Sequence, residues 1–312
     1  MNTPNVWHVG NAKITRVAEF DDYVLDPEFI FPIRPDAVRQ HEWLLPHFIT
    51  PAGQFLVSIH AFVIEVNKRR ILVDTCVGND KKRHIAAWND LKGTFLADLT
   101  SAGYPPESID TVICTHLHLD HVGWNTRCVD GKWIPTFPNA RYLFGRIEWA
   151  HWQKEMELEA AAEAPAAHAA DLDIGAVMGD SIQPIIDAGL HDLVEVDHRL
   201  CEEVVLEHTP GHTPGHVCVR ISSAGENAVI TGDLMHHPIQ CALPELGTHV
   251  DWNPERSTQT RLRFFSQFAD KPVLVLGTHF AKPTSGWLIS RGDRWQLSVE
   301  RPVEIPSAQR RR

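Results

Sequence analysis

The sequence predicts a mixed fold of the α/β or α+β class, in which strands and helices alternate along the chain. Short apolar runs rich in Val, Ile and Leu, typical of buried β-strands, alternate with segments whose apolar residues recur every three or four positions, as in amphipathic helices. Hydrophobic residues make up 43% of the 312 residues and charged residues 22%, as in ordinary globular proteins. No internal repeat and no long linker divides the chain.

The expected strands are apolar runs bounded by turn residues. They are KITRVAEF (13–20), AFVIEV (61–66), RRILVDTC (69–76), TVICTH (111–116), ARYLFG (140–145), VVLEHTPG (204–211), HVCVRIS (216–222), NAVITGD (227–233) and VLVLGTH (273–279).

Three helices are expected. The first covers residues 93–103 and ends at Gly103, and the second runs from Ile147 to about Glu163. The third follows Asn253 and Pro254, a plausible cap and first turn. We expect the apolar stripe of the second helix to pack in the core; it consists of Trp149, Trp152, Met156 and Ala160. The third carries Leu262, Phe265 and Phe268, and the alanine-rich stretch 159–180 is interpreted as a helix end followed by a mobile surface segment.

Charge and composition argue against several classes of partner. The net charge of −11 disfavours a nucleic-acid surface, because phosphates would be repelled. No run reaches the roughly 18 apolar residues that span a membrane. The first residues lack a basic segment followed by an apolar one, so no signal peptide is expected. Six scattered cysteines without a CxxC pair indicate reduced thiols and hence a cytoplasmic protein.

The histidines indicate where the chemistry lies. His116, His118, Asp120 and His121 occupy six positions directly after the apolar run TVIC. Three further candidates, His212, Asp233 and His279, also follow apolar runs. Because strand ends at one edge of a sheet converge on a crevice, we expect these side chains to meet there.

The spacing of the first four candidates predicts two metal ions rather than one. In an extended segment His116, His118 and Asp120 would point the same way, whereas His121 would join them only after a turn, which Gly123 makes plausible. One group can then serve one ion while Asp120 and His121 serve a neighbouring one. Imidazole nitrogen and carboxylate oxygen favour Zn²⁺, with Mn²⁺, Fe²⁺ and Co²⁺ as alternatives.

At these residues the chain resembles the metallo-β-lactamase superfamily over roughly residues 57–280. The HxHxDH signature is present at residues 116–121, and TPGHTPGH, TGD and GTHF carry the later motif residues His212, Asp233 and His279. LVDT (72–75) matches an early family strand. The resemblance implies an α+β fold, a four-layer αββα sandwich, formed by a single domain over residues 1–312 with an N-terminal extension of about residues 1–56.

The resemblance also implies a role for each motif residue. His116, His118 and His212 would hold the first metal; Asp120, His121 and His279 would hold the second; and Asp233 would bridge them. Asp74 would orient a ligand histidine through its other ring nitrogen, and His216 would support its loop. A hydroxide bridging the two metals would attack the substrate, with Asp120 and His236 as the catalytic residues.

The layout resembles most the methyl parathion hydrolase-like and lactonase-like branch, which also has an extended N-terminal segment. Quorum-quenching lactonases place a Tyr three residues after the bridging Asp, where this chain has His236. That departure favours a broader expectation: hydrolysis of an ester, lactone or phosphotriester bond in a small molecule, by a protein that forms a homodimer as relatives do. The alternatives are an iron-containing oxidoreductase similar to persulfide dioxygenases and a non-catalytic binding protein on the same fold.

Two questions about the pocket stay open at this level. His236 and His237 either support the site or donate a hydrogen bond to the substrate. Trp124 and Asn125 are candidates to wall the pocket, and core packing is the alternative for Trp124. The pocket shape is expected to depend on residues 20–56 and 146–200.

Overall fold

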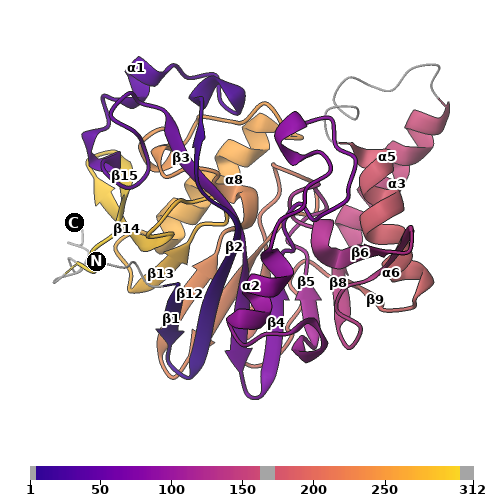
Figure 1. Ribbon diagram of the computed structural model, residues 1–312. Coiled ribbons are helices and arrows are strands. Elements are labelled where there is room, and N and C mark those ends of the chain that lie inside the picture. Colours follow the sequence, from indigo (N-terminus) through magenta and orange to yellow (C-terminus); the bar gives the residue numbers. More distant parts are fainter. Residues whose placement is uncertain (1–4, 162–172, 303–312) are drawn as a thin grey trace.

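The computed structural model describes residues 5–161 and 173–302, which form two large β-sheets covered by helices (Figure 1). The first sheet has the order β1-β2-β3-β4-β5-β8-β9. Its strands are β1 (Val6–Val9), β2 (Ala12–Leu25), β3 (Phe55–Val66), β4 (Arg69–Val73), β5 (Thr111–Ile113), β8 (Arg141–Gly145) and β9 (His191–Val194). The second sheet runs in sequence order from β10 to β15. Its strands are β10 (Val204–His208), β11 (Val217–Ser223), β12 (Glu226–Ile230), β13 (Val273–Leu276), β14 (Ser285–Arg291) and β15 (Arg294–Ser298).

Helices and a small hairpin complete the chain. The hairpin joins β6 (Thr126–Val129) to β7 (Lys132–Pro135). The α-helices are α1 (Pro35–Val38), α2 (Phe95–Ser101), α3 (Arg146–Ala161), α5 (Ile174–Val177), α6 (Gln183–Asp187), α7 (Ile239–Ala242) and α8 (Pro254–Phe268). A π-helical turn, η6 (Met178–Ile182), connects α5 to α6. In Figure 1 the indigo-to-magenta part of the chain carries β1–β5, and the orange-to-yellow part carries β12–β15 and α8.

The two sheets pack face to face through alternate residues of each strand. On β4, Ile71 and Val73 belong to the cluster between the sheets, while Leu72 faces the helices. On β12, Ala228 and Ile230 face the other sheet, while Val229 turns away from it. Alternate residues of these strands are thus buried between the sheets or on the outer face. Burial on both faces explains the near-continuous apolar runs of the sequence.

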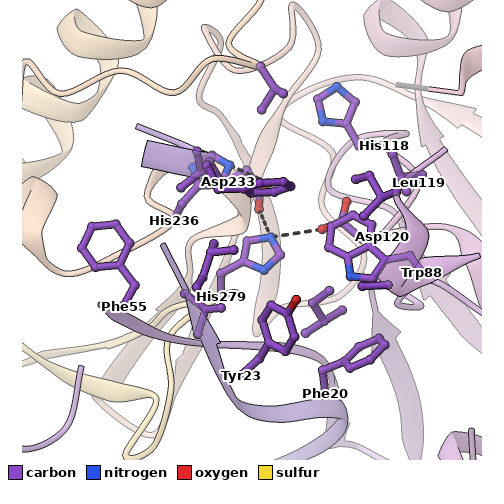
Figure 2. Close-up of a pocket in the computed structure, with 18 of the residues that line it drawn as sticks. Phe20, Tyr23, Phe55, Trp88, His118, Leu119, Asp120, Asp233, His236 and His279 are labelled. Carbon is purple, nitrogen blue, oxygen red and sulfur yellow. Dashed lines mark ion pairs between the residues drawn. The ribbon is translucent and has the colours of Figure 1, made fainter. Parts of the chain in front are cut away.

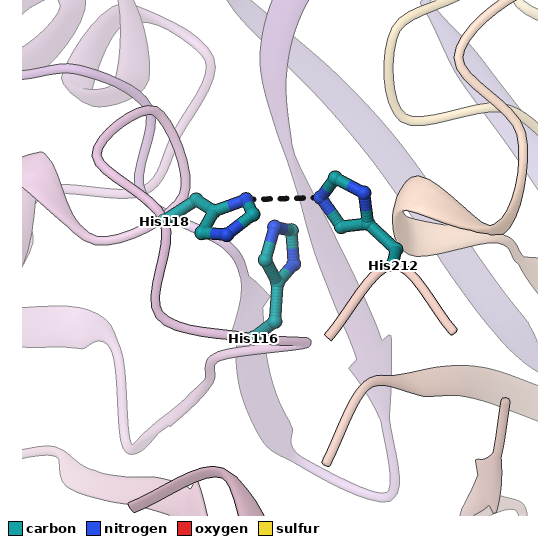
Figure 3. A group of neighbouring side chains, drawn as sticks. All are labelled: His116, His118 and His212. Atoms are coloured by element: carbon teal, nitrogen blue, oxygen red, sulfur yellow. Dashed lines mark hydrogen bonds between the residues drawn. The ribbon is translucent and has the colours of Figure 1, made fainter. Parts of the chain in front are cut away.

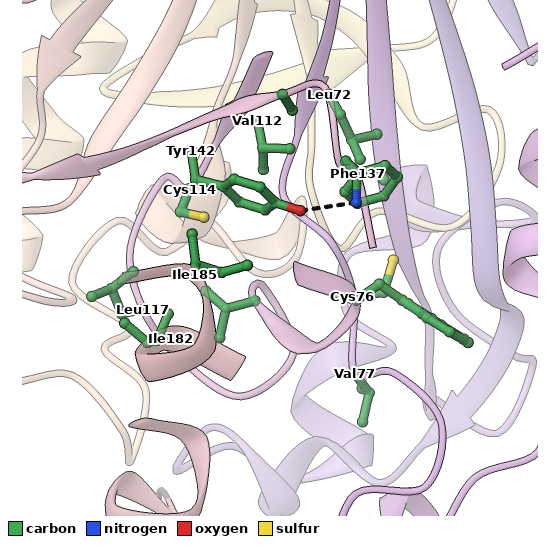
Figure 4. Close-up of a cluster of buried hydrophobic side chains, with 14 of the residues drawn as sticks. Leu72, Cys76, Val77, Val112, Cys114, Leu117, Phe137, Tyr142, Ile182 and Ile185 are labelled. Carbon is green, nitrogen blue, oxygen red and sulfur yellow. Dashed lines mark hydrogen bonds between the residues drawn. The ribbon is translucent and has the colours of Figure 1, made fainter. Parts of the chain in front are cut away.

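Helices cover the outer face of each sheet. Against the first sheet pack α2, α3, α5 and α6, and Figure 4 shows part of this layer, where the Tyr142 hydroxyl accepts a hydrogen bond from the backbone N–H of Phe137 at 3.0 Å. Against the second sheet packs α8, through Phe264, Phe265 and Phe268. The arrangement is the four-layer αββα sandwich that the resemblance implied.

The expected elements are present, with shifted ends. All nine expected strands exist, but those that precede the histidine motifs end earlier; TVICTH, for example, contributes only Thr111–Ile113. The helix after Asn253 is α8, and the Asn253 side chain accepts a hydrogen bond from the N–H of Arg256 at 2.9 Å, as a cap does. Of the apolar residues noted on this helix, Phe265 and Phe268 are buried and Leu262 is 38% exposed.

The second expected helix is α3, and its stripe is only partly in the core. Trp152 is buried and Trp149 packs against the cluster, whereas Met156 is 37% exposed. The side chain of Ala160 and most of the expected surface segment 159–180 lie outside the described residues. The described end of that segment forms α5 and part of η6.

Two hairpins were missed although the sequence signals them. Asp130-Gly131, between β6 and β7, has positive φ at both residues, the signature of a type I′ turn. A two-residue connection, Gly292-Asp293, likewise joins β14 to β15.

Within the described residues, no helix is both long enough and apolar enough to cross a membrane.

Candidate metal centre

The HLHLDH segment leaves β5 and does not continue as a strand. The backbone N–H of His121 donates to the carbonyl of His118 at 3.0 Å, so the chain turns within the motif. The turn expected from the spacing is therefore present, and it brings His121 to the same side as its neighbours. Like His116, the later motif residues lie three to four residues beyond the ends of their strands, His212 and His279 in loops and Asp233 in a short 3-10 helix, η7 (Gly232–Leu234).

His116, His118 and His212 form one group (Figure 3). The rings converge from two different loops, and Nδ1 of His118 lies 2.9 Å from Nε2 of His212. All three side chains are buried. Nε2 of His116 is enclosed without a hydrogen-bond partner among the described residues. An enclosed imidazole nitrogen with no protein partner is the state expected of a metal-binding nitrogen.

A second group consists of Asp120, His121 and His279. Nε2 of His279 lies 3.3 Å from Nε2 of His121 and 3.6 Å from Oδ2 of Asp120. Figure 2 shows the His279 ring between the carboxylates of Asp120 and Asp233. Ring nitrogens this close, beside a carboxylate, suit a single cation.

Asp233 lies between the two groups. Its Oδ2 is 3.3 Å from Nε2 of His212 on one side and 3.3 Å from Nε2 of His121 on the other. Its Oδ1 is 3.1 Å from Nε2 of His279. The carboxylate therefore reaches members of both groups, which is the position that the resemblance gave to a bridging residue.

Carboxylates behind the histidines set their orientation. Nδ1–H of His121 donates to Asp74 at 3.0 Å, the contact expected from LVDT. Nδ1–H of His212 donates to Asp251 at 2.9 Å, a residue that the sequence did not single out. With Nδ1 donating to a carboxylate in this way, Nε2 of each ring is turned towards the centre.

Glu148, at the start of α3, ties two motif loops together. Its carboxylate accepts hydrogen bonds from the N–H of Leu117 at 3.2 Å and from the N–H of Gly215 at 3.0 Å. Gly215 is required here because a Cβ at this position would lie 2.3 Å from the backbone nitrogen of Glu148. Sequence reasoning placed Glu148 in a helix but found no role for it.

The remaining histidines differ in position. His216 accepts a hydrogen bond from the N–H of Asp233 at 2.8 Å, as expected of a residue that supports the loop. His237 points away from the cluster, because its Nε2–H donates to the carbonyl of Phe48 at 2.8 Å. His236 points into it, with Nε2 3.0 Å from Oδ2 of Asp233.

Burial and charge set the protonation of the cluster. Burial lowers the pKa of His116 and of His118 well below the usual range, and neighbouring histidines lower it further. Burial also lowers the pKa of His121, but Asp233, Asp120 and other carboxylates outweigh it and raise the pKa well above its usual value. Burial would raise the pKa of Asp233, yet the surrounding histidines hold it well below the usual range. Asp233 is therefore a carboxylate, and His116 and His118 offer neutral nitrogens, the forms that bind metal ions.

A cavity of about 670 Å³ opens over the cluster. Figure 2 shows Phe20, Tyr23, Phe55 and Trp88 around it. Its walls come from residues 20–31, 55–59, 84–88 and 249–250. The expectation for residues 20–56 is borne out, but no described residue of 146–200 lines the cavity.

A described residue of 146–200 contacts the chain beside the cavity wall. Asp180 in η6 accepts two hydrogen bonds from the buried Arg83 guanidinium at 2.8 and 2.9 Å, next to the wall formed by 84–88. Trp124 and Asn125 are buried and do not line the cavity, so the core alternative is correct for Trp124 and the expectation that Asn125 walls the pocket is wrong. Trp124 stacks on Phe95, with ring centroids 5.8 Å apart.

A model of the metallo-β-lactamase superfamily matches residues 55–279. The chain belongs to the metallo-β-lactamase superfamily. The matched range begins at β3 and ends at His279, so it contains every residue of both groups, and β1 and β2 precede it.

Sequence identity to individual relatives is low. An N-acyl homoserine lactonase of Bacillus sp is 24% identical over 194 residues, which are 58% of this chain and 65% of the lactonase. One from Bacillus cereus is 23% identical over 197 residues, with the same shares. The match thus spans just under two thirds of the length of these relatives.

Two solved structures show the same fold over almost the whole chain. The hydrolase AbOPH has a TM-score of 0.76 at 24% identity, covering 97% of this chain and 99% of its own. AidC, a dizinc quorum-quenching lactonase in complex with a product, has a TM-score of 0.73 at 20% identity, covering 96% and 98%.

Proposed function

We propose that the protein is a dinuclear metallohydrolase that cleaves an ester or lactone bond of an uncharged small molecule. The observation that carries the proposal is the pair of ligand groups that share Asp233 at the floor of a largely apolar cavity. The names of the relatives and structural neighbours, lactonases and hydrolases of one superfamily, support the same reaction class.

The side chains fit two divalent cations. His116, His118 and His212 would hold one ion, Asp120, His121 and His279 the other, and Asp233 both. The enclosed Nε2 of His116 and Oδ1 of Asp233 lack hydrogen-bond partners among the described residues, which a cation would remedy. Nitrogen and oxygen donors favour Zn²⁺, and the dizinc neighbour supports that choice.

When bound, the two ions supply Lewis-acid chemistry, lowering the pKa of water and polarising the bond under attack. The protein's own groups hold the geometry. Asp74 and Asp251 keep the Nε2 lone pairs of His121 and His212 pointing inward. Asp120 faces both the second group and the cavity, and His236 contacts Asp233 beside the cavity. We therefore retain Asp120 and His236 as the residues nearest to the reaction.

The cavity indicates what kind of substrate fits. Aromatic and aliphatic side chains dominate its wall, and no Lys or Arg of the described residues lines it. A carboxylate or phosphodiester substrate would find no cation there beyond the metal centre, whereas an uncharged acyl or aryl group would bury apolar surface. N-acyl homoserine lactones are candidates through the relatives' names, and phosphotriesters through the branch resemblance alone.

The proposal is tested by metal analysis and a substrate panel on purified protein. Aryl and alkyl esters, N-hexanoyl homoserine lactone and an aryl phosphotriester are assayed before and after chelation. We expect two ions per chain, turnover of an ester or lactone, and loss of turnover on chelation. A fully active preparation with one ion or none, or no turnover by protein carrying two ions, would contradict it.

Three further expectations accompany this function. We propose a single domain over residues 1–312, in which the extension of about residues 1–56 adds β1 and β2 to the first sheet and walls the cavity. The six unpaired cysteines support a cytoplasmic protein. A homodimer without nucleic-acid or membrane partners is the assembly expected from the resemblance and the net charge of −11.

A further inference from the structure

Strand β2 is irregular where it passes the cavity. Phe20 pairs with Ile59 and Tyr23 pairs with Val57, so β2 has one residue more than β3 between these pairs. In a regular strand Phe20 and Tyr23, three positions apart, would face opposite sides. Because of the bulge both line the cavity. Bulges of this kind re-aim side chains and are common beside active sites.

Charged groups hold the bulge in place. Asp21, within it, accepts a hydrogen bond from the buried Arg16 guanidinium at 2.7 Å and also pairs with Lys282. Arg16 donates in addition to the Ser58 hydroxyl at 2.5 Å, and the carbonyl of Ser58 accepts a hydrogen bond from Nδ1–H of His279 at 3.1 Å. The network that aims the side chains of the bulge is therefore continuous with a ligand of the metal centre.

The Tyr23 hydroxyl is not used by the protein itself. It has no hydrogen-bond partner among the described residues, although its ring packs edge-on against Phe20 at 6.3 Å. Two other polar groups in the wall are occupied: the Ser58 hydroxyl donates to the carbonyl of Phe20 at 2.9 Å, and His237 donates to that of Phe48 at 2.8 Å. The side chain is 38% exposed and faces the cavity.

Figure 2 shows the Tyr23 hydroxyl turned towards His279, on the Asp120 side of the centre. We propose that Tyr23 donates a hydrogen bond to the substrate oxygen on which negative charge develops, an inference that rests on the proposed function. His236, three positions after Asp233 in the chain, has Nε2 3.0 Å from Oδ2 of Asp233. Tyr23 supplies a second donor to the same cavity, from strand β2.

The role requires no proton transfer from tyrosine. Hydrolysis consumes one water, whose oxygen bonds to the acyl carbon while the bond to the leaving oxygen breaks. The leaving oxygen takes up a proton that originates from that water, and Tyr23 keeps its own. A phenol can act this way because its O–H group is a hydrogen-bond donor. Such a donor stabilises the transition state more than the ground state, because the charge on the oxygen is larger there.

The test compares Tyr23→Phe with Tyr104→Phe as the matched control. Both remove one phenol oxygen, but Tyr104 is buried and its hydroxyl bonds to Thr15 at 2.9 Å, among residues that do not line the cavity. Metal content is measured by elemental analysis, and kcat and KM are measured on the ester and lactone panel. For Tyr23→Phe we expect two retained ions and a kcat lowered by about 10²-fold, the usual cost of removing one such donor. KM should change little, since the apolar ring remains, and Tyr104→Phe should match the wild type.

Three outcomes would overturn the inference. The first is a kcat within about twofold of wild type for Tyr23→Phe, which would leave the ring as a wall only. The second is loss of metal from that variant, which would place its effect at the ligands. The third is a wild-type protein that carries two ions and cleaves nothing in the panel, which removes the proposed function and this inference together.

Discussion

Asp74→Asn tests how the loop after β4 supports the metal centre. The Asp74 carboxylate is 1% exposed and accepts three hydrogen bonds, two from Thr115 at 2.8 and 2.9 Å and one from Nδ1–H of His121 at 3.0 Å. Its φ of +58° lies in the left-handed region, which asparagine tolerates better than most residues. The backbone should therefore stay in place while the charge and one acceptor are lost.

The magnitude follows from those contacts. The amide of Asn has one oxygen, so at least one donor must face an NH₂ group. The backbone N–H of Thr115 on Oδ1 cannot turn away, so the amide oxygen should stay opposite it and the NH₂ group should replace Oδ2, which serves the Thr115 hydroxyl and His121. The hydroxyl can rotate, but His121 can adapt only by moving its proton to Nε2, which lies 3.3 Å from Asp233 in the metal centre. A hydrogen bond to a charged group contributes about 1.5–3 kcal/mol. The affinity for one ion should therefore fall about 10–100-fold.

The assay is a titration of metal-free protein with Zn²⁺ against a chromophoric chelator. We expect Asp74→Asn to weaken one of the two ions and to leave the other near its wild-type affinity. Asp251→Asn is the matched control, because it removes the same kind of support from His212 and should weaken the other ion. Wild-type affinity for both ions in Asp74→Asn would refute the reasoning.

Three further predictions concern the same centre. Asp233→Ala should lose most of the bound metal and lower turnover by orders of magnitude in a chain that still folds; near-normal turnover would remove Asp233 from the site. His236→Ala should keep both ions and lower turnover about 10²–10⁴-fold for substrates with poor leaving groups, and hardly at all for nitrophenyl esters; an equal loss across a leaving-group series, reversed by added metal, would identify a support for the ligands. Burial lowers the pKa of His237 to about 3, so between its unfolded pKa near 6.5 and pH 3 only the unfolded state takes up this proton, and stability falls as the pH falls. The free energy of unfolding is measured with denaturant at several pH values. In His237→Gln its slope against pH should be smaller than in the wild type by about 1.4 kcal/mol per pH unit between pH 6 and 4, and an unchanged slope would show that His237 does not titrate in this way.

The sequence by itself determined the elements with strong local patterns. Apolar runs such as ILV before Asp74 and VLVL before His279 form strands in any fold that buries both faces of a sheet, so their positions were predictable. The HLHLDH motif was predictable as a ligand cluster, because its residues are close in sequence and one turn is enough to gather them. The ends of the strands were not predictable, because the turn that gathers the motif also ends the pairing of β5 with its neighbouring strands early.

Only the tertiary structure decided which distant side chains complete the centre. Asp251 supports His212 from 39 positions away, and Glu148 reaches Gly215 from 67 positions away, with no pattern that marks either residue. Tyr23 enters the cavity because two unequal stretches of β2 and β3 pair, a property of the register and not of the local sequence. Periodicity reports which face of an element is buried, whereas contacts between loops depend on how whole sheets pack, and that information is spread over the entire chain.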